Sequence, residues 1–147
     1  VGALLEGVKL RAALGEAMGL ARAVNAYLEQ APWYGVIGTD REAAATTVYT
    51  ALREIDSLKV LLAPFVPFSS ETLHGILGYE RPLFGRQEIV RYDESSRSHE
   101  VLVYDGSEAS GRWEPSRLGP GQRLERPLAL FKKLDEGIVV EEHSKRD

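Results

Sequence analysis

Apolar residues recur at helical spacing along the first third of the chain. Between residues 4 and 29 they form one stripe, with members three or four positions apart, and this predicts a single long amphipathic helix. The stripe consists of Leu10, Ala13, Leu14, Ala17, Leu20, Ala21, Val24, Tyr27 and Leu28. Pro32 is expected to stop this helix, because the residue before a proline is pushed out of the helical conformation.

A second helix is predicted to open at Thr39, because Thr39-Asp40-Arg41-Glu42 fits a capping box. Its apolar positions alternate in steps of three and four, which is typical of a seam between two helices. These positions are Ala44, Val48, Ala51, Ile55, Leu58 and Leu62. Pro64 and Pro67 are expected to end the helix. Ser69 is expected to cap a short third helix that runs through Leu73, Ile76 and Leu77 and stops at Gly78.

The character of the sequence changes after residue 78. Residues 88–92 and 100–104 are short runs rich in β-branched and aromatic side chains, separated by a polar turn at 93–98. This pattern predicts a β-hairpin. A lone hairpin is marginally stable in water, so it is expected to pack against the helices or against something outside the chain. Residues 105–127 are expected to form an irregular loop, and residues 128–140 a semi-apolar tail.

Composition narrows the class of protein. The chain has 147 residues, the usual size of one domain, and no cysteine, which excludes disulfides and thiolate chemistry. No apolar run is long enough to span a membrane, and no signal peptide is visible. The net charge of −4 argues against holding nucleic acid by bulk charge, but not against reading a few unstacked bases. The first residue is Val1, so the chain is expected to be processed or cut from a longer one.

Candidate catalytic groups are sparse. His74, His99 and His143 are not spaced as metal ligands, and all three are interpreted as surface histidines. The segment 119–121 is a turn rather than a phosphate-binding loop, because Pro120 lacks an amide donor. The sequence therefore predicts no catalytic residue, no metal ligand and no cofactor site.

Two tryptophans remain to be explained. Trp33 follows Pro32 and is interpreted as a core residue that closes the turn between the two long helices. Trp113 lies in the polar stretch 110–115, beside Arg112, where it could stack on a nucleotide base or cap the edge of the core. The residues alone leave these two roles for Trp113 equally open.

Three segments together carry the pattern of one family. Residues 20–33 end in the corner Ala31-Pro32-Trp33, residues 61–68 are followed by Leu73-His74, and residues 127–135 read Pro-Leu-Ala-Leu-Phe-Lys-Lys-Leu-Asp. In this order they resemble the anticodon-binding domain of methionyl-tRNA synthetases. Class I synthetases for valine, leucine, isoleucine and cysteine share the helical domain and the corner, and the tail favours methionine over them.

The resemblance implies a mostly α fold: a helical bundle of the class I synthetase anticodon-binding type, with a small β-hairpin insertion and an irregular C-terminal tail. The helices would occupy 1–78, the hairpin 79–112, and a Trp loop with the closing tail 113–147. The sequence lacks the family's His-Ile-Gly-His and Lys-Met-Ser-Lys-Ser signatures, and the family's helix preceding Val1. The chain alone is therefore expected to be inactive, with ATP, and zinc if any, bound by the missing catalytic domain.

The resemblance also implies partners and a site. The partners would be a methionine tRNA with the anticodon CAU and the enzyme's own catalytic domain, in the cytoplasm and without a membrane. In the family a Trp in the loop before the tail stacks on an anticodon base, which assigns that role to Trp113. Arg112 and Arg117 are expected to reach phosphates or base edges. Asn25, Tyr27 and Trp33 are assigned to the fold and not to RNA binding.

Three other interpretations compete with this one. The chain could be the anticodon-binding domain of another class I synthetase. It could be a non-catalytic interaction module whose hairpin and tail dock another protein or a second copy. A small stand-alone enzyme is the third alternative, and no constellation of catalytic groups supports it.

Overall fold

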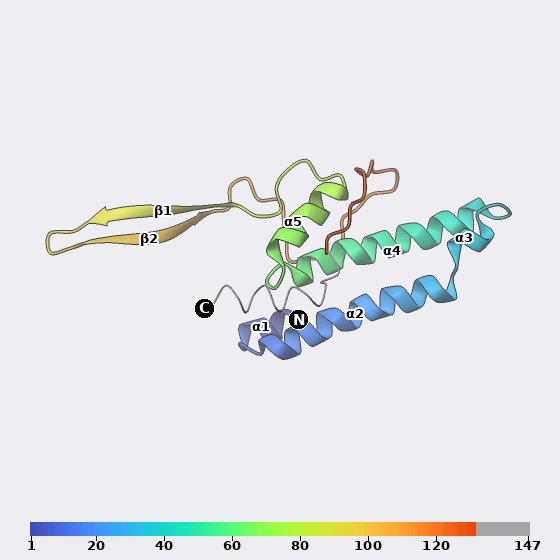
Figure 1. The fold of residues 1–147 in the computed structure, drawn as a ribbon, viewed down its shortest axis with the longest axis horizontal. Helices are drawn as coiled ribbons and strands as arrows, with labels where there is room; N and C mark the ends of the chain where they lie inside the picture. Colours follow the sequence, from blue (N-terminus) through green and yellow to red (C-terminus); the bar gives the residue numbers. More distant parts are fainter. Residues whose placement is uncertain (132–147) are drawn as a thin grey trace, which may run out of the picture.

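Two long antiparallel helices, α2 (Leu10–Gln30) and α4 (Arg41–Leu62), form the body of the protein (Figure 1). The short α3 (Trp33–Val36) joins them at one end, and α1 (Gly2–Glu6) and α5 (Pro67–Ile76) lie toward the other. The structure, a computed structural model, describes residues 1–131. None of the helices within that range has the length and apolar character needed to cross a membrane.

The predicted single helix over 4–29 is wrong at its start. The chain forms α1 first, breaks at Gly7 and Val8, and only then begins α2. Val8 has φ of 55°, in the left-handed region that β-branched residues rarely adopt. Its neighbour Lys9 donates its backbone N–H to the carbonyl of Leu4 at 2.8 Å, which closes the end of α1. The stop before Pro32 is confirmed, since α2 ends at Gln30.

Small residues form the contact between the long helices. Ala13, Ala17 and Val24 of α2 are buried, as are Ala44 and Ala51 of α4. Of the predicted seam on α4, only these two alanines are fully buried, and Thr47 joins them. Short side chains bring the two backbones close together. The larger apolar residues of α4 are therefore half-buried along the sides of the contact.

The helix caps differ from two of the predictions. Asp40, not Thr39, caps α4, because its carboxylate accepts the backbone N–H of Ala43 at 2.9 Å. Ser69 does not cap α5 either. That helix begins two residues earlier with Pro67, whose missing N–H is no loss in the first turn. Gly78 ends the α5 region as predicted, with φ of 83°.

The β-hairpin is confirmed. Strands β1 (Arg86–Asp93) and β2 (Ser98–Asp105) pair antiparallel with Arg86 opposite Asp105 and Asp93 opposite Ser98. The hairpin projects beyond the α1 end of the helical body, away from α3 (Figure 1). Its residues are exposed almost throughout both strands. This two-stranded unit is called the ribbon below.

After the ribbon, the chain returns over α4 and α5 without regular secondary structure, as predicted for residues 105–127. Hydrogen bonds fasten it: Tyr49 donates its hydroxyl to the carbonyl of Leu118 at 3.0 Å, and Arg53 donates to the carbonyl of Ser116 at 3.0 Å. The backbone N–H of Glu125 donates to the carbonyl of Ile76 at 2.9 Å. Most of the predicted tail over 128–140 lies outside the described residues.

Gly78 is expected to be intolerant of a side chain. A Cβ atom at this position would collide with the carbonyl oxygen of Arg123, and the backbone is left-handed. Gly78→Ala should therefore lower the free energy of unfolding by at least about 1–2 kcal/mol, the usual cost of the left-handed conformation alone. Gly75→Ala, in α5 with open space around its Cβ, is the matched control and should be neutral or stabilising by up to about 1 kcal/mol. Urea unfolding of both variants measures the difference, and equal midpoints would contradict the expected clash.

Candidate nucleic-acid interface

Trp113 lies on the surface beside the first helix, at the ribbon end of the body. Its side chain is 52% exposed, and its indole nitrogen lies against Gly2, where an added Cβ would stand 3.0 Å away. The ring also lines an open groove of about 420 Å³, together with Phe84 and Tyr104 at the base of the ribbon. Trp113 is thus neither buried nor isolated from the rest of the fold.

The two arginines predicted to act with Trp113 are engaged locally. The guanidinium of Arg112 donates to the carbonyls of Ala109 at 3.2 Å and Gly111 at 2.8 Å. Arg117 forms an ion pair with Glu114 at 2.7 Å, so a carboxylate already offsets its charge. The structure places all three predicted residues in one loop, but it does not aim the two guanidinium groups at a shared surface site.

Trp33 is not the buried plug that the sequence interpretation predicted. It opens α3 at the far end of the helical pair, and 38% of its side chain is exposed. The ring lines one side of an open groove of about 460 Å³ between the end of α2, α3 and the start of α4. A corner of only ten residues joins the ends of α2 and α4. That geometry leaves the Trp33 ring at the edge of the core.

The groove beside Trp33 is almost wholly apolar. Its walls are formed by Leu28, Trp33, Ile37, Arg41, Ala44, Ala45, Val48, Ala51, Leu52 and Ile55. Arg41 is the single charged residue among them, and it forms no ion pair with any residue between 1 and 131. Tyr34 stands edge-on to the Trp33 ring, with the ring centroids 6.0 Å apart, and is largely exposed. The groove, which we call the Trp33 groove, combines an aromatic wall with one cation at its rim.

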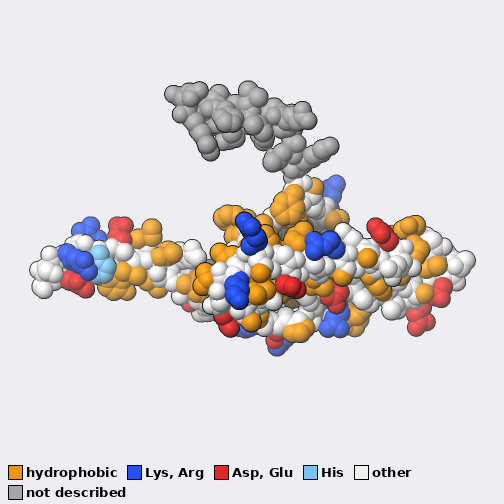
Figure 2. Space-filling model, turned by 90° about the horizontal axis from the view of Figure 1, so that it is seen from below, with side chains coloured by type: hydrophobic (Ala, Val, Ile, Leu, Met, Phe, Trp, Pro, Cys, Tyr) orange, Lys and Arg blue, Asp and Glu red, His pale blue; other side chains and the backbone are white. Residues whose placement is uncertain are grey.

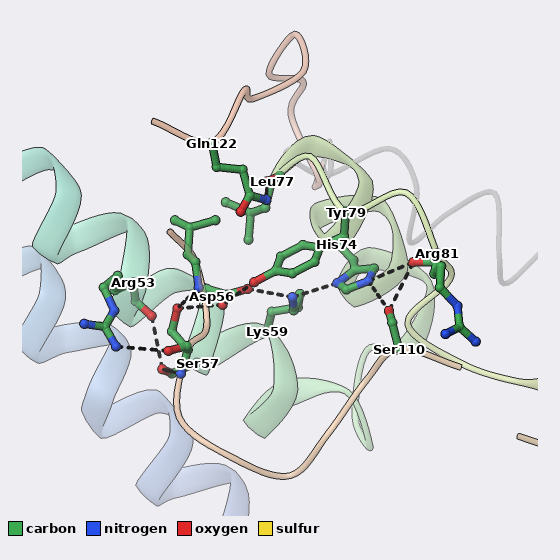
Figure 3. A network of polar contacts seen from close by, with 12 residues as sticks. Arg53, Asp56, Ser57, Lys59, His74, Leu77, Tyr79, Arg81, Ser110 and Gln122 are labelled. Carbon is green, nitrogen blue, oxygen red and sulfur yellow. Dashed lines mark hydrogen bonds and ion pairs between the residues drawn. The ribbon is translucent and has the colours of Figure 1, made fainter. Parts of the chain in front are cut away.

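A buried polar network lies in the interior where α4, α5 and the returning loop meet (Figure 3). The ammonium group of Lys59 donates to the carboxylate of Asp56 at 2.6 Å and to Nδ1 of His74 at 2.7 Å. The second carboxylate oxygen of Asp56 accepts hydroxyl hydrogen bonds from Tyr79 at 2.8 Å and Ser116 at 2.6 Å. Each charged group thus has several partners in place of water.

His74 corrects the prediction of three surface histidines. It is only 3% exposed, its ring stacks on Tyr79 with centroids 4.3 Å apart, and its Nε2 lies 3.0 Å from the carbonyl of Arg81. Because Nδ1 accepts from Lys59, the proton of the neutral ring is assigned to Nε2, which donates toward Arg81. Of the other two, His99 is half-buried on the ribbon and His143 lies outside the described residues.

The surroundings shift the pKa values of this network. Burial, together with the nearby Lys59 charge, lowers the pKa of His74 below its usual value of 6.5. Burial would raise the pKa of Asp56, but the hydrogen bonds from Lys59, Ser116 and Tyr79 outweigh it and lower the pKa. Burial raises the pKa of the Tyr79 hydroxyl, and its bond to Asp56 raises it further. The network therefore holds an ionised Asp56 beside a neutral His74.

This network joins α4, the α5 region and the returning loop. Its polar atoms bond to one another, and the space among them amounts to about 60 Å³, too little for a substrate. Residues 1–131 contain no group of three or more His, Cys, Asp or Glu side chains placed to hold a metal ion. On the face shown in Figure 2, Lys and Arg side chains are scattered among acidic and apolar ones without a continuous basic surface.

A pair of long helices with an aromatic groove at its tip and a buried polar network defines a mostly α-helical domain. The family model for the anticodon-binding domain of methionyl tRNA ligase matches residues 2–103. The chain belongs to this family of anticodon-binding domains.

Curated methionine–tRNA ligases are similar to the chain along nearly its whole length. The methionine–tRNA ligase of Thermomicrobium roseum is 49% identical over 99% of this chain, and that of Chloroflexus aurantiacus is 51% identical over 97%. The methionine–tRNA ligase of Beutenbergia cavernae is 37% identical over 97%. The chain spans only 24–25% of the length of these relatives. No solved structure matches the chain significantly.

Removal of one partner from the buried ion pair should be costly. Asp56→Ala leaves Lys59 charged and without its carboxylate in the interior, which typically lowers the free energy of unfolding by about 3–5 kcal/mol. Glu94→Ala breaks an exposed pair with Arg97 on the ribbon and should cost at most about 1 kcal/mol. Denaturant unfolding of the two variants compares them, and a loss from Asp56→Ala as small as that of the control would refute the structural role of the network.

The free energy of unfolding should also decrease as the pH is lowered, because of His74. Above pH 6.5 the ring is neutral in both the folded and the unfolded chain, so it adds no pH dependence. Below 6.5 the unfolded chain binds a proton that the folded chain resists, because burial of the ring and the facing charge of Lys59 lower the pKa of His74, and Glu71 and Asp56 only partly offset them. The free energy of unfolding should therefore decrease as pH falls through this window, by at most about 1.4 kcal/mol per pH unit.

Thermal midpoints near pH 7.5 and near pH 5.5 test this dependence. His74→Gln should flatten it, whatever its effect on the absolute midpoint, whereas His99→Gln on the ribbon should keep it. If the wild-type slope survived in His74→Gln, another group would be responsible.

Proposed function

We propose that the chain binds the anticodon of a methionine tRNA, with the sequence CAU, as part of a longer methionine–tRNA ligase acting in the cytoplasm. The family match and the names of relatives up to 51% identical support the tRNA and the amino acid. In this proposal, ATP-dependent attachment of methionine belongs to the rest of a longer polypeptide, since the chain spans only 24–25% of the length of its relatives. This chain supplies selection of the tRNA.

The observation that carries the proposal is the exposed aromatic wall of the Trp33 groove. An unstacked base recovers stacking energy on an aromatic ring, whatever its identity, and single-stranded loops are read in this way. The groove volume of about 460 Å³ is within the range of small-molecule sites. Arg41 at the rim can reach a phosphate or a base edge once a base lies against Trp33.

Trp113, the platform expected from the sequence, is the second candidate. Its exposure and its groove of about 420 Å³ are comparable with those of Trp33. Two observations favour Trp33. Arg112 and Arg117 direct their guanidinium groups to neighbouring carbonyls and to Glu114, whereas Arg41 has no ionic partner among residues 1–131. Trp33 also stands at the tip of the body, while Trp113 packs against α1 at the opposite end.

The charge of the chain fits recognition by stacking. The sequence carries 18 basic and 22 acidic residues, so bulk attraction to phosphates is weak. A domain of this kind would depend on a few base contacts and would discriminate against RNA that presents no unstacked loop. Affinity for an anticodon loop should therefore depend only mildly on salt.

The experiment is tRNA binding by the full-length enzyme with either tryptophan replaced. Trp33→Ala should weaken binding of the CAU tRNA by about 1–3 kcal/mol, or roughly 5- to 150-fold in Kd, the usual value of one stacked base. Trp113→Ala is the matched control, because it removes a ring of similar exposure at the other end of the body. A tRNA with a changed anticodon supplies the background, and far-ultraviolet circular dichroism confirms that both variants stay folded.

Each outcome decides between the platforms. A large loss in Trp33→Ala together with little change in Trp113→Ala supports the Trp33 groove. The reverse pattern assigns the role to Trp113, as the sequence predicted. If neither variant lost affinity, or if both lost it equally for CAU and for the changed anticodon, base stacking by this chain would be refuted.

A further inference from the structure

The ribbon stands apart from the Trp33 groove, and no other element between residues 1 and 131 covers it. It projects from the end of the body opposite α3 (Figure 1). Large apolar side chains are exposed on it, such as Ile89 at 70% and Leu102 at 64%. In Figure 2 hydrophobic side chains (orange) lie along the ribbon between charged ones. A two-stranded hairpin in water is marginal at best, so a surface that covers one of its faces would stabilise it.

The apolar side chains on one face of the ribbon are more exposed than those on the other. Side chains alternate between faces along a strand and directly paired residues share a face, so Ile89, Leu102 and Tyr104 lie together on one side. We call this side the Leu102 face. Val101 and Val103 lie on the opposite side, the Val103 face, and are exposed by only 38% and 37%.

The charges of the ribbon argue against an RNA partner. Residues 86–105 contain three arginines and five carboxylates, a net charge of −2. Each arginine already forms an ion pair within the ribbon: Arg86 with Glu88, Arg91 with Asp93 and Arg97 with Glu94. Binding to phosphates needs cations that are not already neutralised. The exposed apolar side chains Ile89, Leu102 and Tyr104 favour contact with a protein surface instead.

The size of the face argues for a partner in the same polypeptide. Strands of eight residues are about 26 Å long, and two of them present a face roughly 10 Å wide, which gives on the order of 260 Å². A stable complex between separate proteins buries about 800 Å² on each partner. Tethering within one chain raises the effective concentration to about the millimolar range, where a small apolar face suffices.

The base of the ribbon lies next to the start of the chain. Trp113 packs against Gly2 in α1 and lines one groove with Phe84 and Tyr104, so the first helix and the ribbon base are neighbours. The relatives align with this chain over 97–99% of its length, ribbon included, and are about four times as long.

We infer that the Leu102 face of the ribbon docks on the part of the same polypeptide that lies outside residues 1–147, and so helps to fix the anticodon-binding domain against the rest of the enzyme. This inference rests on the proposed function only in requiring the longer protein. The contact is intramolecular and apolar, made by Ile89, Leu102 and Tyr104, and it needs no tRNA.

Hydrogen exchange of the full-length enzyme without tRNA tests this contact. Backbone amides of residues 86–105 should be protected in the wild type. Leu102→Glu should speed their exchange by about tenfold or more, because a carboxylate then faces the docking surface. Val103→Glu, its neighbour on the opposite face, is the matched control for any weakening of the ribbon itself and should change exchange by less than about twofold.

A photoreactive benzoyl-phenylalanine in place of Leu102 identifies what the face touches. The inference expects an internal cross-link to a peptide outside residues 1–147, at a yield that does not change when the enzyme is diluted tenfold. A cross-link between two molecules would assign the face to a second copy and overturn the inference. Fast exchange in the wild type, or equal effects of Leu102→Glu and Val103→Glu, would overturn it as well. These readouts contain no RNA, so they are independent of the Trp33 result.

Discussion

The ion pair between Asp56 and Lys59 is the interaction on which the arrangement of this domain depends. Both residues belong to α4, one turn apart, and both are buried. Neither charge could remain in the interior alone, so each requires partners from other segments. α5 supplies His74, the segment after it supplies Tyr79, and the returning loop supplies Ser116. Because the buried pair needs these partners, it holds all three segments in fixed positions against α4.

The two halves of α4 make different contacts. Its first half packs on α2 through Ala44, Thr47 and Ala51, which are small enough for the helices to approach closely. This close contact leaves no room in the core for the large ring at the corner, so Trp33 lies at the edge of the groove. The second half of α4 carries the polar network and the loop. One helix therefore positions the candidate RNA site at one end and the attachment of α5, the loop and the ribbon at the other.

Most elements of this fold could be predicted from the sequence, but the burial of the residues in and around the candidate site could not. The helical stripes and the alternating strands are local patterns, and they identified α2, α4, α5 and both strands. The break at Val8 could not be read in this way, because a left-handed valine runs against local preference and is held by the surrounding structure. The burial of His74 depends on Lys59, fifteen residues away, and on a loop still more distant. A signal did exist: Asp56 and Lys59 are charged residues that interrupt the apolar side of a predicted helix, and such a pair requires buried partners.

The two tryptophans show how far sequence alone can predict exposure. Trp33 follows an apolar helix, which predicted a core residue, whereas the polar loop around Trp113 left a stacking role and a cap on the core edge equally open. In the structure the two differ little in exposure, because the burial of a large ring depends on what lies across from it. The groove beside Trp33 is lined by Ala44, Ala45, Val48 and Ala51 of α4 together with larger residues, and it leaves part of the ring uncovered. For Trp113 the neighbouring residue is Gly2, whose missing side chain makes space for the indole. Small residues thus contribute in both places: those of α4 line an open groove beside one ring, and Gly2 lets the other ring pack against the first helix.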